Sequence, residues 1–191
     1  MGCEEMENDS QLRGVLAAYK LVAEASWPNL HSRMRVAAPS WATATAARLQ
    51  SELSAYLNEA SAPSCTVRVF WKYAPQFKFG GCNEHFAHDA GLAHASDLVG
   101  LTDFDPRIPW RAQAGKYRHD DEEIVRDGEP KLDIIERQTS TTGITWVRAG
   151  KAPIFESGGQ AFGVLGMYEI LEQDAGRKLW AARQRGATSA G

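Results

Sequence analysis

Apolar residues recur at helical spacing in the first part of the chain. Between residues 10 and 25 they form one stripe, which consists of Leu12, Val15, Leu16, Tyr19 and Val22. Spacings of three and four residues place such side chains on one face, so the stripe predicts an amphipathic helix. The helix should end before Trp27-Pro28, because the residue that precedes a proline avoids the α conformation.

A second amphipathic helix is predicted over residues 40–60. Leu49, Leu53 and Leu57 lie four residues apart, and Ser40 can cap the first turn. Traced backwards, the stripe meets Thr45 and Trp41, so its first half is less apolar. An amphipathic helix needs a surface for its apolar face. We expect a hairpin of the two helices against the rest of the chain, with a dimerisation surface as the alternative.

From Cys65 onward the pattern changes to short runs with the alternation of β-strands. Strands are predicted over residues 66–71, 77–79, 131–139, 144–155 and 161–171. Helical segments are predicted between them over residues 83–90, 96–99 and 109–126, the first capped by Asn83. Strand pairs at both ends with helices between them predict an α+β domain, with a five-stranded antiparallel sheet and these helices on one face.

Three regions follow from this reading. Residues 1–62 form an N-terminal helical extension, residues 63–173 form the α+β domain, and residues 174–191 form a tail or the start of an output helix. Within the domain, the carboxylates Asp103, Asp105 and 120–123 show no spacing typical of an acid/base pair. We interpret them as solvated or helix-capping groups.

Composition narrows the functional classes. The chain has 191 residues, 43% hydrophobic and 24% charged, with a net charge of -3, which gives no electrostatic reason to expect nucleic acid or an anionic membrane. No apolar run is long enough to span a bilayer. Three scattered cysteines predict no disulfide framework and a cytoplasmic location. Nucleotide-binding loops, nucleophile elbows and metalloprotease motifs are absent from the sequence, so we expect no enzyme.

Several ordered segments between Val67 and Gln173 resemble the PAS family of sensory domains, in the subgroup of bacterial sensor kinases and cyclic-di-nucleotide signalling proteins. The matching segments are residues 69–72 with 77–79, 82–87 (similar to N-x-x-F-A), 98–105 (similar to hhGxTDxD), 117–121, 127–130, 135–136, 146–153 and 163–166. One departure lies at residues 170–172, which read Ile-Leu-Glu where the family usually has an Asp-Ile-Thr junction.

The resemblance implies a pocket between sheet and helices, and a sensor that shifts between two packings when a ligand or partner binds. The side chains expected to line the pocket are Phe79, Phe86, Trp110, Ile134, Trp146 and Leu165. A filled hydrophobic core is the alternative for these residues. The implied partners are a second copy in a homodimer and an effector such as a histidine kinase or diguanylate cyclase. A dimerisation or protein-interaction module without a ligand is the alternative function.

Cofactors are left open between none, flavin and haem. His119 lies on the helix that supplies the proximal histidine in haem-binding PAS sensors, but its charged neighbours favour a solvated side chain. Cys82, His85 and His88 recur every three residues, with His94 further on, yet no second compact ligand pair completes a metal site. The cysteine motif of flavin-adduct photosensors is absent, which leaves only a noncovalent flavin.

Overall fold

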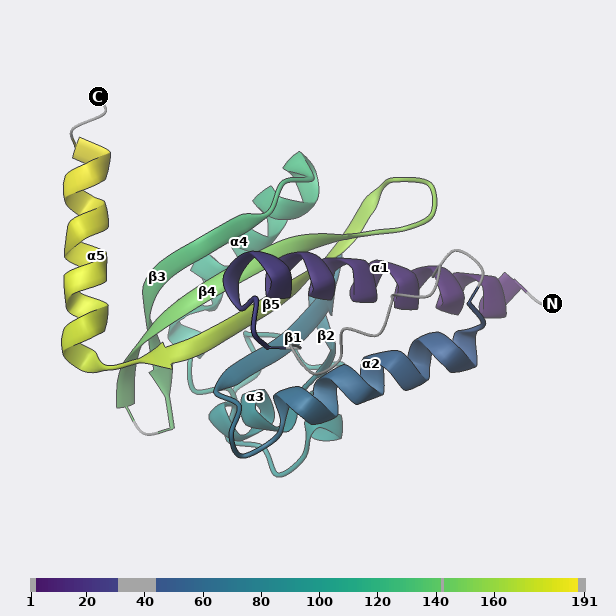
Figure 1. Ribbon diagram of the computed structural model, residues 1–191, viewed down its shortest axis with the longest axis horizontal. Coiled ribbons are helices and arrows are strands. Elements are labelled where there is room, and N and C mark those ends of the chain that lie inside the picture. Colours follow the sequence, from purple (N-terminus) through teal and green to yellow (C-terminus); the bar gives the residue numbers. More distant parts are fainter. Residues whose placement is uncertain (1–2, 31–43, 142, 189–191) are drawn as a thin grey trace.

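The computed structural model describes residues 3–30, 44–141 and 143–188. The five strands form one antiparallel sheet in the order β2-β1-β5-β4-β3 (Figure 1). The elements in chain order are α1 (Cys3–Ser26), α2 (Ala46–Ala60), β1 (Val67–Tyr73), β2 (Lys78–Cys82), α3 (Glu84–Asp89), 3-10 helices Ala95–Leu98 and Arg111–Gln113, α4 (Ala114–Asp127), β3 (Lys131–Ser140), β4 (Gly143–Phe155), β5 (Ala161–Leu171) and α5 (Gln173–Thr188).

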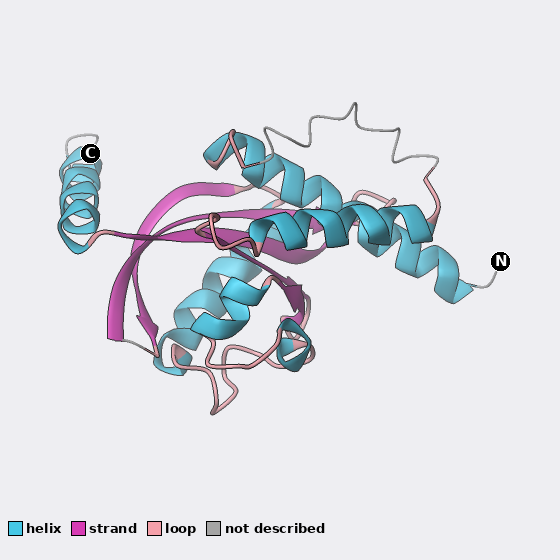
Figure 2. Ribbon diagram, turned by 60° about the horizontal axis from the view of Figure 1, so that its bottom comes forward, coloured by secondary structure: helices cyan, strands magenta, loops and turns pink. Residues whose placement is uncertain are grey.

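Helices cover both faces of the curved sheet. The segment from α3 to α4 lies on one face, which we call the inner face, and α1 and α2 lie on the other, the outer face (Figures 1 and 2). Side chains of β1 divide accordingly, because successive residues of a strand point to opposite sides. Phe70 packs in the inner cluster and Trp71 in the outer one. The predicted sheet with helices on one face is confirmed, and the N-terminal extension supplies the outer layer.

The N-terminal hairpin packs on the sheet of its own chain. Val15, Leu16, Tyr19 and Val22 of α1 are buried in one cluster with residues of β1, β4 and β5. Gly14 allows the close approach, because a Cβ there would lie 2.4 Å from the Phe155 carbonyl oxygen. α2 starts at Ala46 with Thr45 as its cap, so the predicted start is displaced; Ser40 and Trp41 lie outside the described residues.

Two predicted boundaries inside the domain differ from the structure. β2 continues through Gly80 and Gly81 to Cys82. Both positions need glycine, because the Trp71 ring lies over them and leaves no room for a Cβ. The helix predicted to open at residue 109 begins at Ala114, after a 3-10 turn that follows Trp110. The Trp110 indole donates to Asp103, which holds the chain in that turn.

α5 begins directly after β5 and packs sparsely. Gly176 lies against Trp146 of β4, and the Trp146 and Trp180 ring centroids are 5.9 Å apart. Arg183 forms an ion pair with Asp133 of β3. In the described part of the chain, no helix is long and apolar enough to cross a membrane.

We predict that Gly14→Ala lowers the free energy of unfolding by about 1–3 kcal/mol, because the added methyl group must push α1 off β4. Urea denaturation of both proteins measures the difference.

Gly115→Ala in α4 is the matched control, since no atom lies within 4 Å of the position of its Cβ. It should raise stability by up to about 1 kcal/mol through helix propensity. Equal effects of the two substitutions would contradict the close packing of α1 on the sheet.

Candidate functional site

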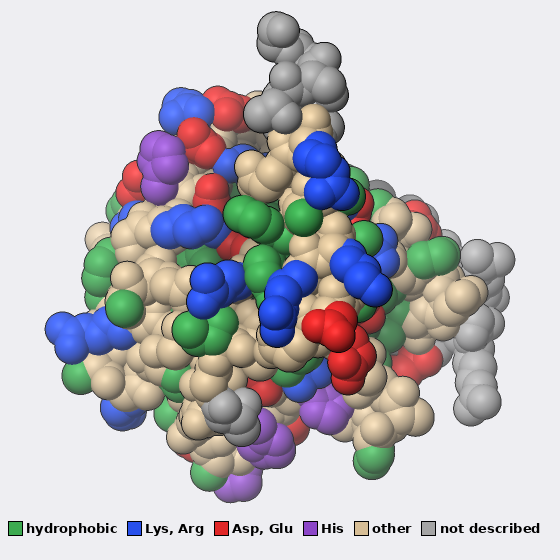
Figure 3. All heavy atoms as spheres, turned by 90° about the vertical axis from the view of Figure 1, so that its left-hand side faces the viewer, with side chains coloured by type: hydrophobic (Ala, Val, Ile, Leu, Met, Phe, Trp, Pro, Cys, Tyr) green, Lys and Arg blue, Asp and Glu red, His purple; other side chains and the backbone are tan. Residues whose placement is uncertain are grey.

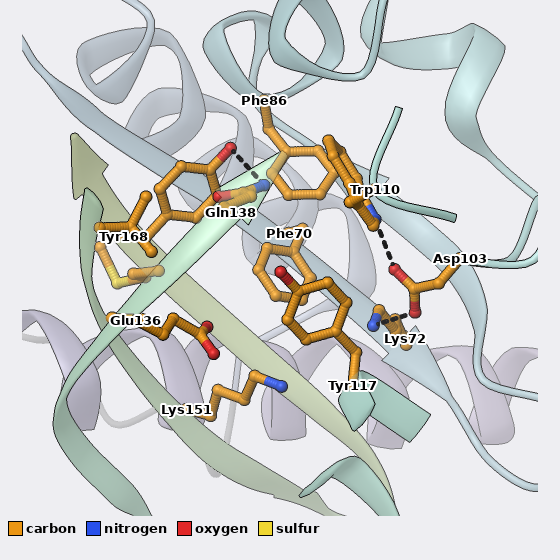
Figure 4. A pocket seen from close by; sticks show the side chains of 13 residues that line it. Phe70, Lys72, Phe86, Asp103, Trp110, Tyr117, Glu136, Gln138, Lys151 and Tyr168 are labelled. Carbon is orange, nitrogen blue, oxygen red and sulfur yellow. Dashed lines mark hydrogen bonds and ion pairs between the residues drawn. The ribbon is translucent and has the colours of Figure 1, made fainter. Parts of the chain in front are cut away.

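A small cavity lies between the inner face of the sheet and the helices (Figure 4). The centre of a water-sized sphere can reach about 40 Å³ of it, which is room for about three water molecules. The lining residues come from β1, α3, the loop before α4, α4 itself, β3, β4 and β5. They are Phe70, Lys72, Phe86, Asp103, Trp110, Tyr117, Glu136, Gln138, Val147, Ala149, Lys151, Met167 and Tyr168.

Aromatic rings form one side of the cavity. The Phe86 ring centroid lies 4.7 Å from that of Phe70, 5.4 Å from that of Trp110 and 5.9 Å from that of Tyr168. The edge-to-face arrangements with Trp110 and Tyr168 are favourable for ring quadrupoles. Figure 4 shows Phe86 and Trp110 at one end of the cavity, and Glu136 and Lys151 at the opposite end.

Four buried charges form a chain of ion pairs beside these rings. The Lys72 Nζ donates to Asp103 Oδ2 at 2.6 Å and to Asp121 Oδ2 at 2.8 Å. The Lys151 Nζ donates to Asp121 Oδ1 at 2.6 Å. Trp110 Nε1 donates to the second Asp103 oxygen at 2.8 Å. These four charged side chains are 0–7% exposed, and the two cations balance the two anions, as burial requires.

The network controls the charge states of Lys72 and Asp121. Burial by itself would raise the pKa of Asp121, but the ammonium groups of Lys151 and Lys72 outweigh it, and the pKa is lowered. Burial would likewise lower the pKa of Lys72, but Asp103 and Asp121 outweigh it and raise that pKa. Both groups therefore stay charged at neutral pH.

Some polar groups of the cavity wall retain hydrogen-bonding capacity. Among the described residues, the Lys151 ammonium makes one hydrogen bond and can donate two more. Figure 4 shows this ammonium pointing into the cavity. Gln138 is buried, and its Nε2 lies at the long distance of 3.5 Å from the Tyr168 hydroxyl. A molecule in the cavity can therefore be recognised by an ammonium and an amide.

One side of the cavity is closed by side chains that join α4 to β3. Lys116 of α4 forms an ion pair with Glu136 of β3. Gln113, just before α4, donates to the Arg137 carbonyl at 2.9 Å and accepts from the Thr139 amide at 2.9 Å. Since these contacts are side-chain interactions near the surface, this seam can open without breaking the sheet.

Four of the six predicted pocket residues lie on the inner side. Phe86 and Trp110 line the cavity. Phe79 packs behind them, with its ring centroid 5.6 Å from that of Phe86. Ile134 is partly buried against the same inner cluster.

The prediction that Trp146 and Leu165 line the cavity is corrected by the structure. Leu165 packs in the outer cluster with α1 and α2, and Trp146 contacts α5. Both sit on strands that are buried on two faces, where hydrophobicity does not show which way a side chain points. On this part of β4 the cavity is lined by Val147, the neighbour of Trp146.

The charged residues of the site were missed or misread in the sequence. Asp103 and Asp121 were expected to be solvated or capping groups, but both are buried ion-pair partners. A signal was present, since Lys72 lies between Trp71 and Tyr73, and Lys151 between Gly150 and Ala152, each within a largely apolar strand. A lysine in such a position must find a buried carboxylate.

Neither haem nor flavin fits the site as it stands. The His119 side chain is 72% exposed and its Nε2 lies 3.3 Å from Glu123, on the surface of α4 and away from the cavity. Ligand pockets typically have about 300–1,000 Å³, well above the space found here. Among the residues that the structure describes, no group of three or more His, Cys, Asp or Glu could hold a metal ion. His85 instead contacts the Ala62 carbonyl.

Comparisons with known proteins identify the fold. No family model matches the chain, and no curated protein matches it. The phage VqmA–DPO complex aligns with a TM-score of 0.54 and 18% identity over 71% of this chain and 60% of that one. An RNA-binding light-oxygen-voltage (LOV) receptor aligns at 0.51 and 15% over 80% of this chain and 41% of that one.

A further LOV domain, from a study with a flavin analogue, aligns at 0.50 and 13% over 73% of this chain and 96% of that one. The chain matches 47–60% of the length of the VqmA chains. At these identities the likeness establishes the fold alone. The fold is PAS-like, and the sensor-kinase and cyclic-di-nucleotide subgroup finds no support.

We predict that Asp121→Asn lowers the free energy of unfolding at pH 7 by about 3–5 kcal/mol, because it leaves two buried ammonium groups with one carboxylate. The loss should shrink as the pH falls below about 4, the ordinary pKa range of aspartate. The folded-state pKa is lowered, so the stabilisation is present above that range and disappears as Asp121 becomes protonated.

Urea denaturation between pH 3 and pH 7 provides the measurement. Asp120→Asn removes the neighbouring, partly exposed carboxylate and should cost about 1 kcal/mol or less. Similar losses for the two variants would show that the buried network does not stabilise the fold.

Proposed function

We propose that this chain is a sensory module that binds a small, uncharged ring compound in the cavity and passes the change to its flanking helices. The observation that carries the proposal is the pairing of an aromatic wall with the partly unused Lys151 ammonium. The ion pair with Asp121 accounts for one of the three donors of Lys151 and leaves two for a molecule in the cavity. A cytoplasmic location is part of the proposal.

Charge and shape define the ligand class. The four buried charges already balance, so a charged ligand would leave a net charge without a partner in the interior. The rings of Phe70, Phe86 and Trp110 favour a flat ring by stacking and edge contacts. Lys151 favours a carbonyl oxygen or ring nitrogen that accepts a hydrogen bond.

The size of the cavity gives the sensor its mechanism. A ring compound needs more than about 40 Å³ of reachable space, so the walls must move when it binds. The ligand then shifts the equilibrium from the compact packing to an enlarged one. The size of the shift is set by the difference between the ligand's affinities for the two packings. A ligand that fitted a rigid cavity would produce no such change.

The comparisons support this proposal in part. The aligned phage VqmA structure is a complex with a molecule named DPO, which supports a ligand in this fold class. Another neighbour is named as an RNA-binding receptor, so the expectation of no nucleic-acid partner gains no support. A histidine kinase or diguanylate cyclase as effector rests on the sequence resemblance alone.

We assign the chain no catalytic role. Asp103 accepts from Lys72 and Trp110, and Asp121 accepts from Lys72 and Lys151. A carboxylate that accepts two charge-assisted or indole hydrogen bonds is a poor general base.

A dimerisation module without a ligand is the second candidate. Leu179 and Trp180 of α5 are each 43% exposed. In Figure 3, which views the molecule from the α5 side, hydrophobic side chains lie among Lys and Arg. Exposed apolar groups of this kind favour a protein partner. Sedimentation of Trp180→Ser against the unmodified chain over a range of concentrations tests this candidate.

We predict that the low-molecular-weight fraction of a cell extract raises the melting temperature of the chain by a few degrees, which is the size expected for about 1 kcal/mol of binding energy. Ala149→Phe and Val147→Phe fill the cavity and should abolish the shift. Mass spectrometry of the heat-denatured supernatant then identifies the released compound.

Ala175→Phe on the exposed surface of α5 is the matched control and should keep the full shift. Equal shifts in the filled and unfilled proteins would mean that the compound binds elsewhere. An absorption spectrum with a Soret band or flavin bands would overturn the assignment of an uncharged small ligand.

A further inference from the structure

The first turn of α3 is joined to the end of α2 by a fully bonded side chain. Asn83, the N-cap of α3, is 1% exposed. Its Nδ2 donates to the carbonyls of Ala60 and Val67, both at 2.9 Å. Its Oδ1 accepts from the amides of Val69 at 3.0 Å and Phe86 at 3.2 Å. An amide side chain offers two donors and two acceptor sites, so none is left over.

Two further contacts tie the same two helices. The Glu84 amide donates to Ser61 Oγ at 3.2 Å, and that hydroxyl donates to the Leu57 carbonyl at 2.7 Å. The His85 ring nitrogen Nε2 lies 3.1 Å from the Ala62 carbonyl oxygen. The last carbonyls of a helix lack partners within that helix. Asn83 therefore caps the last carbonyl of α2, and Glu84 and His85 bind the two residues that follow this helix.

The same short helix carries a wall of the cavity. Phe86 follows Asn83 by three residues, and its ring contacts those of Phe70, Phe79 and Trp110. α3 has six residues, so Phe86 and the contacts to α2 lie within one or two turns of each other. Because the Phe86 ring is packed among other rings, we expect a change in the cavity wall at this point to displace α3 and strain its contacts to α2.

We infer that the state of the cavity reaches the N-terminal helical layer through α3, with Phe86 as the receiving residue and Asn83 as the link to α2. The inference rests on the proposed function and names the element that responds. Moving α3 alone would leave the buried Asn83 amide without partners, which is costly. α2 stacks on α1 through Tyr56 and Tyr19, with ring centroids 5.2 Å apart, so the pair is expected to shift together.

Hydrogen–deuterium exchange of the full chain tests this without any ligand. Phe86→Leu perturbs the cavity wall and should speed exchange at residues 57–62, the end of α2, by about tenfold through easier local opening. Asn83→Asp removes both donor bonds to Ala60 and Val67 while the acceptor that caps α3 remains. It should speed the same exchange by itself.

The decisive comparison is the double variant. With Asn83→Asp present, Phe86→Leu should add little at residues 57–62, because the link is already broken. Full addition of the two effects, or no effect of Phe86→Leu on α2, would overturn the inference. His88→Ala, on the exposed side of α3, is the control and should leave α2 unchanged. Peptides of β4 report any global loss of stability.

A second pair of substitutions keeps the test usable if Asn83→Asp does not fold. Ser61→Ala with His85→Ala removes the two outer contacts and allows the same comparison with Phe86→Leu. Since no ligand takes part, the result is independent of the extract experiment, and each can fail without the other.

Discussion

The buried ion network of Lys72, Asp103, Asp121 and Lys151 is the constraint on which the site depends. Its members come from β1, the loop before α4, α4 and β4, so one set of contacts holds α4 and the loop before it on the sheet. None of the four can change alone without leaving a buried charge unpaired. The network fixes the position of Trp110 through Asp103 and thereby the aromatic end of the cavity.

The cavity has one side held by the ion network and one side formed by packed aromatic rings. The ion pairs are strong and specific in geometry, and they hold Trp110 through Asp103, whereas the Phe86 ring is held by ring contacts alone. We therefore expect a change at this end of the cavity to act through Phe86 and α3. From there the Asn83 contacts lead to α2, on the opposite side of the sheet from the cavity. The two layers of helices, which pack in separate clusters, are joined at this point.

Local patterns in the sequence predicted most helices and strands, but they did not predict which distant side chains pair with one another. The stripe of α1 and the Asn83 cap follow from neighbours within a few residues, and both occur in the structure. The ion pair of Lys72 and Asp121 joins residues 49 apart, so only the assembled fold reveals it. The Val147 side chain faces the cavity, whereas that of Trp146 faces α5. Which of the two faces inward depends on the strand register, and the hydrophobicity of a strand buried on both faces does not encode that register.

Fluorine NMR of the chain labelled with 5-fluorotryptophan tests most directly whether the cavity is a ligand site. Trp110 is buried in the cavity wall and can be assigned with Trp110→Phe, whereas Trp180 reports on the surface. The account predicts that some members of a set of small uncharged ring compounds shift the Trp110 signal in a saturable way and by more than the Trp180 signal. A Trp110 signal that no compound moves at millimolar concentration, in a protein that remains folded, would contradict it.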